Sequence, residues 1–151
     1  MNIRKDDLEG AEIQALLHSH LADAYKNSPP ENVHALDIEA LQKPDITFWS
    51  VWEDDVLLGC AALKELSPNH GEIKSMRTSK AALKRGVASK LMTHILEQAR
   101  LRKYTRLSLE TGSNRPYFPA LALYKKFGFT ECPPFANYWE AEFSIYMTLA
   151  L

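Results

Sequence analysis

Cysteine is scarce in this sequence, charge is balanced, and long apolar runs are absent. The two cysteines, Cys60 and Cys132, lie far apart without the spacing of metal ligands, so we expect no metal site and a reduced, cytoplasmic protein. The formal net charge is −1 with Lys and Arg spread along the chain, which argues against nucleic-acid binding through phosphate neutralisation. No run of about 18 apolar residues could cross a membrane, and the N-terminus turns acidic at once, unlike a signal peptide.

The rest of the composition, 46% hydrophobic and 25% charged residues, is typical of one globular domain spanning residues 1–151. Apolar residues recur at helical spacing in three segments, and a fourth, short helix is expected between them. Strand-like runs make up most of the remainder. The predicted helices are 7–25, 36–41, 86–99 and 120–127, and the predicted strands are 2–5, 47–52, 56–66, 72–78, 107–110 and a β-rich end at 143–149. The order β-α-α-β-β-β-α-β-α-β-β predicts an α/β domain whose sheet is mostly antiparallel with a parallel central pair.

The segment from Thr78 to Lys90 is the most informative part of the chain. A strand ends there, a loop rich in small residues follows, and a helix opens near Gly86. Unpaired N–H groups in the first turn of a helix suit an anion, and a glycine lets the backbone approach it closely. A structural loop that contains a glycine explains the pattern equally well. The predicted anion site comprises Lys84, Arg85, Gly86, Val87, Ala88 and Ser89.

Two motifs give the sequence a resemblance to the GNAT family of acetyltransferases. Gly86 and Ala88 occupy the small positions of that family's pyrophosphate loop, Q/R-x-x-G-x-G/A, with Leu83 where Gln or Arg is usual. The second motif, A-x-x-L-Y-x-x-x-G-F, matches the segment from Ala120 to Phe129. The resemblance covers residues 49–149 in the right order and spacing.

This resemblance implies the GNAT fold, with helices on both faces of the sheet and a central parallel pair that splays apart. It implies acetyl-CoA as the acyl donor and a direct transfer to an amine. Pantetheine would pair with the backbone near Met76 and Thr78, and the Met76 N–H would stabilise the oxyanion. Tyr117 stands where the family has a pantetheine-binding Asn, and Asn114 is a nearby substitute.

Three residues are candidates for the proton transfers of this reaction. Glu72, fourteen residues before Gly86, matches the position of the catalytic base in the histone-modifying branch of the family. Glu110 is the rival base, and Glu72 could instead pair with Lys74 at the sheet surface. Tyr124 matches the Tyr that points at the CoA sulfur and would act as the acid, a role compatible with packing of its ring in the core.

The acceptor is less well defined by the sequence. Residues 133–142 carry aromatic and acidic side chains together, which favours a cation with an apolar body, and thus a small-molecule amine. The alternative is that these aromatics cover the core edge or a dimer contact, and homodimers are common in the family. His18 and His20 are interpreted as helix-surface or acceptor-pocket residues. Three functions compete with this one. They are a CoA-binding sensor without catalysis, transfer of another acyl group, and transfer to another acceptor. The side chains of this segment are Phe135, Tyr138, Trp139, Glu140 and Glu142.

Overall fold

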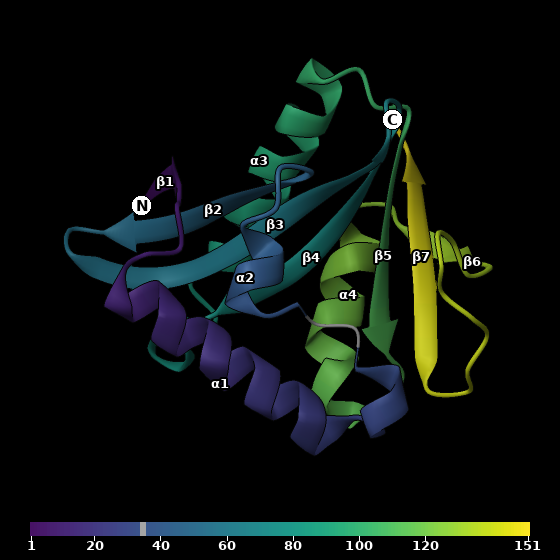
Figure 1. Ribbon diagram of the computed structural model, residues 1–151, viewed down its shortest axis with the longest axis horizontal. Coiled ribbons are helices and arrows are strands. Elements are labelled where there is room, and N and C mark those ends of the chain that lie inside the picture. The colour runs from purple at the N-terminus through teal and green to yellow at the C-terminus, as the bar shows by residue number, and fades with distance from the viewer. Residues whose placement is uncertain (34–35) are drawn as a thin grey trace.

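Seven strands form one sheet in the computed structural model, which describes residues 1–33 and 36–151 (Figure 1). The strand order is β1-β2-β3-β4-β5-β7-β6, and each neighbouring pair is antiparallel except β4 and β5. The predicted mixed sheet with a parallel central pair is therefore confirmed. The strands are β1 (Asn2–Lys5), β2 (Ile46–Glu53), β3 (Val56–Ser67), β4 (His70–Thr78), β5 (Arg106–Gly112), β6 (Thr130–Cys132) and β7 (Ser144–Ala150).

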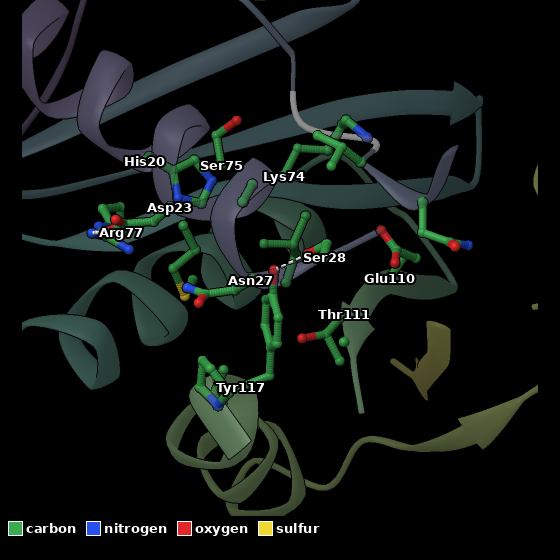
Figure 2. Close-up of a pocket in the computed structure, with 18 of the residues that line it drawn as sticks. His20, Asp23, Asn27, Ser28, Lys74, Ser75, Arg77, Glu110, Thr111 and Tyr117 are labelled. Carbon is green, nitrogen blue, oxygen red and sulfur yellow. Dashed lines mark hydrogen bonds and ion pairs between the residues drawn. The ribbon is translucent and has the colours of Figure 1, made fainter. Parts of the chain in front are cut away.

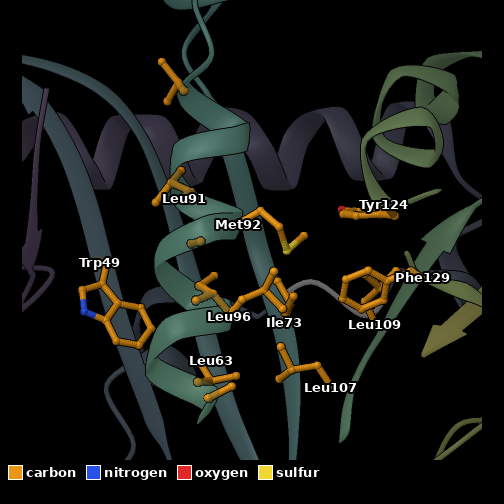
Figure 3. Packing of buried hydrophobic residues seen from close by; sticks show 14 of the residues in the cluster. Trp49, Leu63, Ile73, Leu91, Met92, Leu96, Leu107, Leu109, Tyr124 and Phe129 are labelled. Carbon is orange, nitrogen blue, oxygen red and sulfur yellow. The ribbon is translucent and has the colours of Figure 1, made fainter. Parts of the chain in front are cut away.

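Helices cover both faces of this sheet, as the family resemblance implies. The helices α1 (Ala11–Asn27) and α2 (Ile38–Leu41) lie on one face, and α3 (Val87–Leu101) and α4 (Phe118–Lys126) lie on the other (Figure 1). Strand β3 separates two cores, because Ala61 and Leu63 pack in the α3 and α4 cluster while Cys60 and Ala62 pack under α1 and α2. Figure 3 shows the larger cluster, in which α3 presents Leu91, Met92 and Leu96 to the sheet.

The predicted element order is also confirmed, although α1 begins later than its periodicity suggests. Residues 7–10 form a turn, in which the Asp6 carboxylate accepts the Leu8 N–H at 2.8 Å and the Asp7 carboxylate accepts the Glu9 N–H at 2.9 Å. Short acidic side chains that bond nearby backbone in this way compete with helix formation. The helix therefore starts at Ala11, after Gly10.

The central parallel pair separates toward one end of the sheet. Pairing is limited to His70–Glu72 of β4 and Arg106–Ser108 of β5, although both strands continue beyond it. Strand β4 also contains a bulge, because Cys60 pairs with Arg77 and Ala62 with Lys74, so β4 has one residue more than β3 between these pairs.

The bulge involves Ser75 and Met76, which have no partner in the β3 register. Ser75 takes a positive φ of 54°, which is uncommon for a residue with a side chain. The backbone at Met76 is thus turned away from an ordinary ladder, at the point where β4 and β5 part.

Candidate active site

A cavity of about 230 Å³ opens where β4 and β5 separate. Its walls come from β4, from β5, from the last turns of α1 and from the start of α4, so four distant segments of the chain meet there (Figure 2). Four of the predicted site residues lie in these walls together with the rival base Glu110: Glu72, Met76, Tyr117 and Tyr124.

Glu72 is buried and already bonded. Its Oε2 atom accepts a hydrogen bond from Tyr138 Oη at 2.5 Å and lies 3.2 Å from Lys74 Nζ. Lys74 Nζ also donates to Tyr138 Oη at 2.7 Å, which closes a triangle of three side chains. The pairing with Lys74 considered from the sequence is therefore present, inside the cavity wall and not at the sheet surface.

Glu110 lies in the splayed part of β5, across the cavity from His20 and Asp23 of α1 (Figure 2). Burial raises the pKa of its carboxyl to about 7, against the opposing effects of a Ser144 hydrogen bond and the Lys74 charge. A carboxyl group with a pKa in this range exchanges protons readily at neutral pH.

Tyr124 combines a packed ring with a position on the cavity. The ring makes an edge contact with Phe129, with centroids 6.1 Å apart, and belongs to the α3 and α4 core (Figure 3). Burial, with a smaller contribution from Glu110, raises the pKa of the Tyr124 phenol to about 12. The phenol therefore keeps its proton throughout the neutral range.

The α1 wall carries an ion pair that sequence reasoning missed. Arg77 on β4 pairs with Asp23 on α1, and His20 lies one turn earlier on the same helix (Figure 2). Burial and the Arg77 charge lower the pKa of His20 to about 4, so this imidazole is neutral at pH 7. Of the sequence interpretations of His20, the acceptor-pocket one agrees with this position. The partners Asp23 and Arg77 are 54 residues apart, and no local pattern signals such a pair.

The two polar residues considered for pantetheine contact the end of α1. Tyr117 Oη lies 2.6 Å from Ser28 Oγ, and Asn114 Nδ2 donates to the Asn27 carbonyl at 2.9 Å. The Tyr117 ring reaches this place because Gly112 has no side chain, since a Cβ there would stand 2.4 Å from the ring. These contacts tie the end of α1 to the segment that precedes α4.

The remaining predicted cofactor residues lie outside the cavity walls, at the end of β4 and the start of α3. Gly86 precedes α3 in the left-handed conformation with a φ of 83°, and a Cβ added there would meet nothing within 4 Å. Arg85 pairs with Glu53 at 2.7 Å in an exposed ion pair, and the Val87 side chain is buried in the core. The main-chain N–H groups of the first turn of α3 are also available to an anion. Thr78, Lys84, Ala88 and Ser89 lie in the same stretch.

The predicted acceptor segment lies largely elsewhere. The Tyr138 hydroxyl contacts Glu72 and Lys74. The Tyr138 ring packs on Phe135 and Tyr146, with ring centroids 5.2 and 5.6 Å away, so Phe135 and Tyr138 cover the edge of the core. This packing turns the rest of the loop outward. The prediction that the segment's other side chains close the cavity is therefore wrong: Trp139 is exposed, and Glu140 and Glu142 border a separate surface hollow.

Three further properties of the described residues complete the description of the site and the fold. No group of three or more His, Cys, Asp or Glu side chains in the described ranges is placed to hold a metal ion. In the same ranges, no helix is long and apolar enough to span a membrane. Cys60 is fully buried, and burial raises the pKa of its thiol to about 12, so it is not a nucleophile.

Comparison with known proteins agrees with this geometry. The sequence model of the Acetyltransferase (GNAT) family matches residues 13–129. The chain is 53% identical over 151 residues, all of both chains, to the "Uncharacterized N-acetyltransferase YsnE" of Bacillus subtilis. It is 47% identical over 149 residues to the "Uncharacterized N-acetyltransferase YedL" of Escherichia coli, covering 99% of this chain and 94% of that one.

A solved structure shares the fold. A GNAT family acetyltransferase from Elizabethkingia anophelis with acetyl-CoA bound superposes with a TM-score of 0.70 at 18% identity, over 99% of this chain and 97% of that one. Because the family's sequence model and full-length relatives both match, the chain belongs to the GNAT family and is an acetyltransferase.

Proposed function

We propose that this protein transfers the acetyl group of acetyl-CoA to the primary amine of a small molecule by direct attack. The observation that carries the proposal is the meeting of Glu110, Tyr124 and the bulged backbone at Met76 around one cavity. Amine acetylation needs a proton acceptor, an oxyanion donor and a group that stabilises the leaving thiolate. These three groups supply one function each.

Glu110 is the better candidate for the base. Its pKa of about 7 matches the working pH, whereas Glu72 is held by Lys74 and Tyr138. Glu110 would take a proton from the attacking ammonium, directly or through a water. Glu72 then serves to fix Lys74 and the Tyr138 loop against β4. The sequence favours Glu72 as the base, so the two assignments need a direct comparison.

The other two groups act on the thioester. As the amine nitrogen bonds to the carbonyl carbon, negative charge develops on the carbonyl oxygen. The Met76 N–H would stabilise that charge by donating a hydrogen bond to the oxygen. The C–S bond then breaks and leaves a thiolate, and the nitrogen releases its second proton to solvent. Tyr124, with a pKa of about 12, is a weaker acid than a thiol with a pKa near 8.5. We therefore assign it a hydrogen bond to the thiolate sulfur, with the final proton reaching sulfur by exchange with solvent.

The proposed position of acetyl-CoA follows the anion site at the start of α3. Its pyrophosphate would bind the main-chain N–H groups from Gly86 to Ser89, and its pantetheine would enter the gap between β4 and β5 near Met76 and Thr78. The Elizabethkingia structure of the same fold contains bound acetyl-CoA, which supports acetyl-CoA as the ligand.

The non-catalytic alternative is a CoA-binding sensor. Replacement of Tyr124 by Phe separates catalysis from acetyl-CoA binding, because it keeps the ring that packs on Phe129 and removes the hydroxyl. We expect turnover to fall roughly 10- to 100-fold, with the acetyl-CoA dissociation constant almost unchanged. The measurement is release of CoA thiol with a panel of primary amines, beside calorimetry for binding. Equal turnover of Tyr124→Phe and the wild type would reduce Tyr124 to a core residue.

A further inference from the structure

The charged groups that line the cavity are matched in pairs. Arg77 pairs with Asp23, and Lys74 pairs with Glu72 at 3.2 Å. Both cations are thus neutralised by carboxylates of the protein itself. Among the described residues that line the cavity, Glu110 is the carboxyl group left outside these two pairs.

Several residues that line the cavity carry a buried polar atom without a hydrogen-bond partner. Four buried side-chain atoms lack a hydrogen-bond partner in the described part of the chain, and three of them belong to cavity residues: His20 Nδ1, Ser75 Oγ and Arg77 Nε. Buried polar groups without a partner are rare in folded proteins, so three among the residues that line one cavity indicate a place where a ligand supplies the partners. The fourth, His94 Nε2, belongs to a ring that packs on Trp49.

The two features lie at different ends of the cavity. Figure 2 shows His20, Asp23 and Arg77 gathered on one side and Glu110 on the other. If the reacting amine lies at Glu110, the opposite end of the acceptor lies against the side of the cavity that carries many hydrogen-bonding groups. The charges of Arg77 and Asp23 neutralise each other there. The His20 imidazole adds no charge, because it is neutral at pH 7.

We infer that the acceptor is an amine whose far end carries a neutral amide, and that Asp23 excludes acceptors with a carboxylate at that end. An amide oxygen can accept from the Arg77 N–H and the Ser75 hydroxyl, and an amide N–H can donate to His20 Nδ1 in one tautomer. A carboxylate would meet the charge of Asp23 and find Arg77 already paired. This inference rests on the proposed function.

The test compares acceptors that differ only at the far end. The series are 5-aminopentanoic acid, 5-aminopentanamide and pentylamine, and 6-aminohexanoic acid, 6-aminohexanamide and hexylamine, with kcat/KM measured for each. We expect the amide to exceed the amino acid by about tenfold or more, the size of one hydrogen bond or charge contact to a charged group. Equal values, or a preference for the amino acid, would overturn the inference.

Asp23→Asn gives the sharper result, because it leaves the Arg77 charge unpaired. The ratio of amino acid to amide should rise by about tenfold, whereas Glu12→Gln, which removes one negative charge from the exposed side of the same helix, should leave it unchanged. Ser75→Ala should lower kcat/KM for the amide and leave kcat/KM for the simple amine unchanged. If these variants fold, by circular dichroism, and keep the wild-type ratios, the inference is wrong.

The same assay separates this inference from the proposal beneath it. Acetylation of pentylamine or hexylamine tests amine transfer alone. If no member of either series is acetylated, the proposed function itself is contradicted and the inference falls with it. If the simple amines react and the amides gain nothing over the acids, only the inference fails.

Discussion

Gly86→Asp should abolish measurable acetyl-CoA binding, with a rise in the dissociation constant of roughly 100-fold or more. The substituted carboxylate would stand at the N-terminus of α3, where the pyrophosphate is proposed to bind, and two anions cannot share that site. No protein atom lies within 4 Å of the position that the new Cβ would take. The left-handed φ of 83° strains a residue with a side chain, but Asp and Asn tolerate it better than most, so the fold should survive. Calorimetry on the folded variant gives the answer.

Two controls separate charge from backbone strain. Gly86→Asn has nearly the shape of the aspartate variant without its charge, and should bind acetyl-CoA better than Gly86→Asp. Gly128→Asp places the same residue at a second left-handed glycine, with a φ of 96°, at the end of α4, and should leave acetyl-CoA affinity near wild type. Wild-type affinity in a folded Gly86→Asp protein would remove the pyrophosphate from this loop.

Glu110→Gln should reduce turnover at pH 7 by roughly 100-fold or more, the contribution expected of a positioned general base. The wild-type rate should rise with pH through about 7, because the Glu110 carboxyl has a pKa of about 7 and is a base only after it loses its proton. The variant should lack this rise and recover part of its activity at high pH, where the free amine no longer needs a base.

Glu72→Gln is the matched comparison, since it makes the same change on the other glutamate that lines the cavity. It removes the charge that Lys74 and Tyr138 contact, so we expect a lower melting temperature and a pH–rate profile that still rises near pH 7. If Glu72→Gln abolishes the rise and Glu110→Gln keeps it, the base is Glu72, as the sequence favours.

Local patterns in the sequence predicted the framework of this molecule. The apolar stripe of α3 and the strand runs around it depend on nearest neighbours along the chain, and the structure confirms their order. Gly86 was likewise visible, because a glycine before an amphipathic stripe is a local signal, and it precedes α3 with a positive φ. The motif around Tyr124 placed that residue in the correct helix, at the cavity.

Contacts between distant residues were beyond that reasoning. The pair Asp23–Arg77 and the bond from Tyr138 to Glu72 join segments 54 and 66 residues apart. The raised pKa of Glu110 comes mainly from burial, which is a property of the assembled cavity. The acceptor segment misled for the same reason, because its composition suggested a pocket while its aromatics pack on the neighbouring strand.

The most direct test of the account is a product balance. The wild-type protein is incubated with acetyl-CoA and a reactive amine, and mass spectrometry follows the N-acetylated amine, the released CoA and the protein itself. Direct transfer predicts one N-acetylated amine for each CoA released, with no acetyl group retained on the protein in the absence of amine. Binding of acetyl-CoA without product, or an acetylated protein that forms before the amine is added, would contradict it.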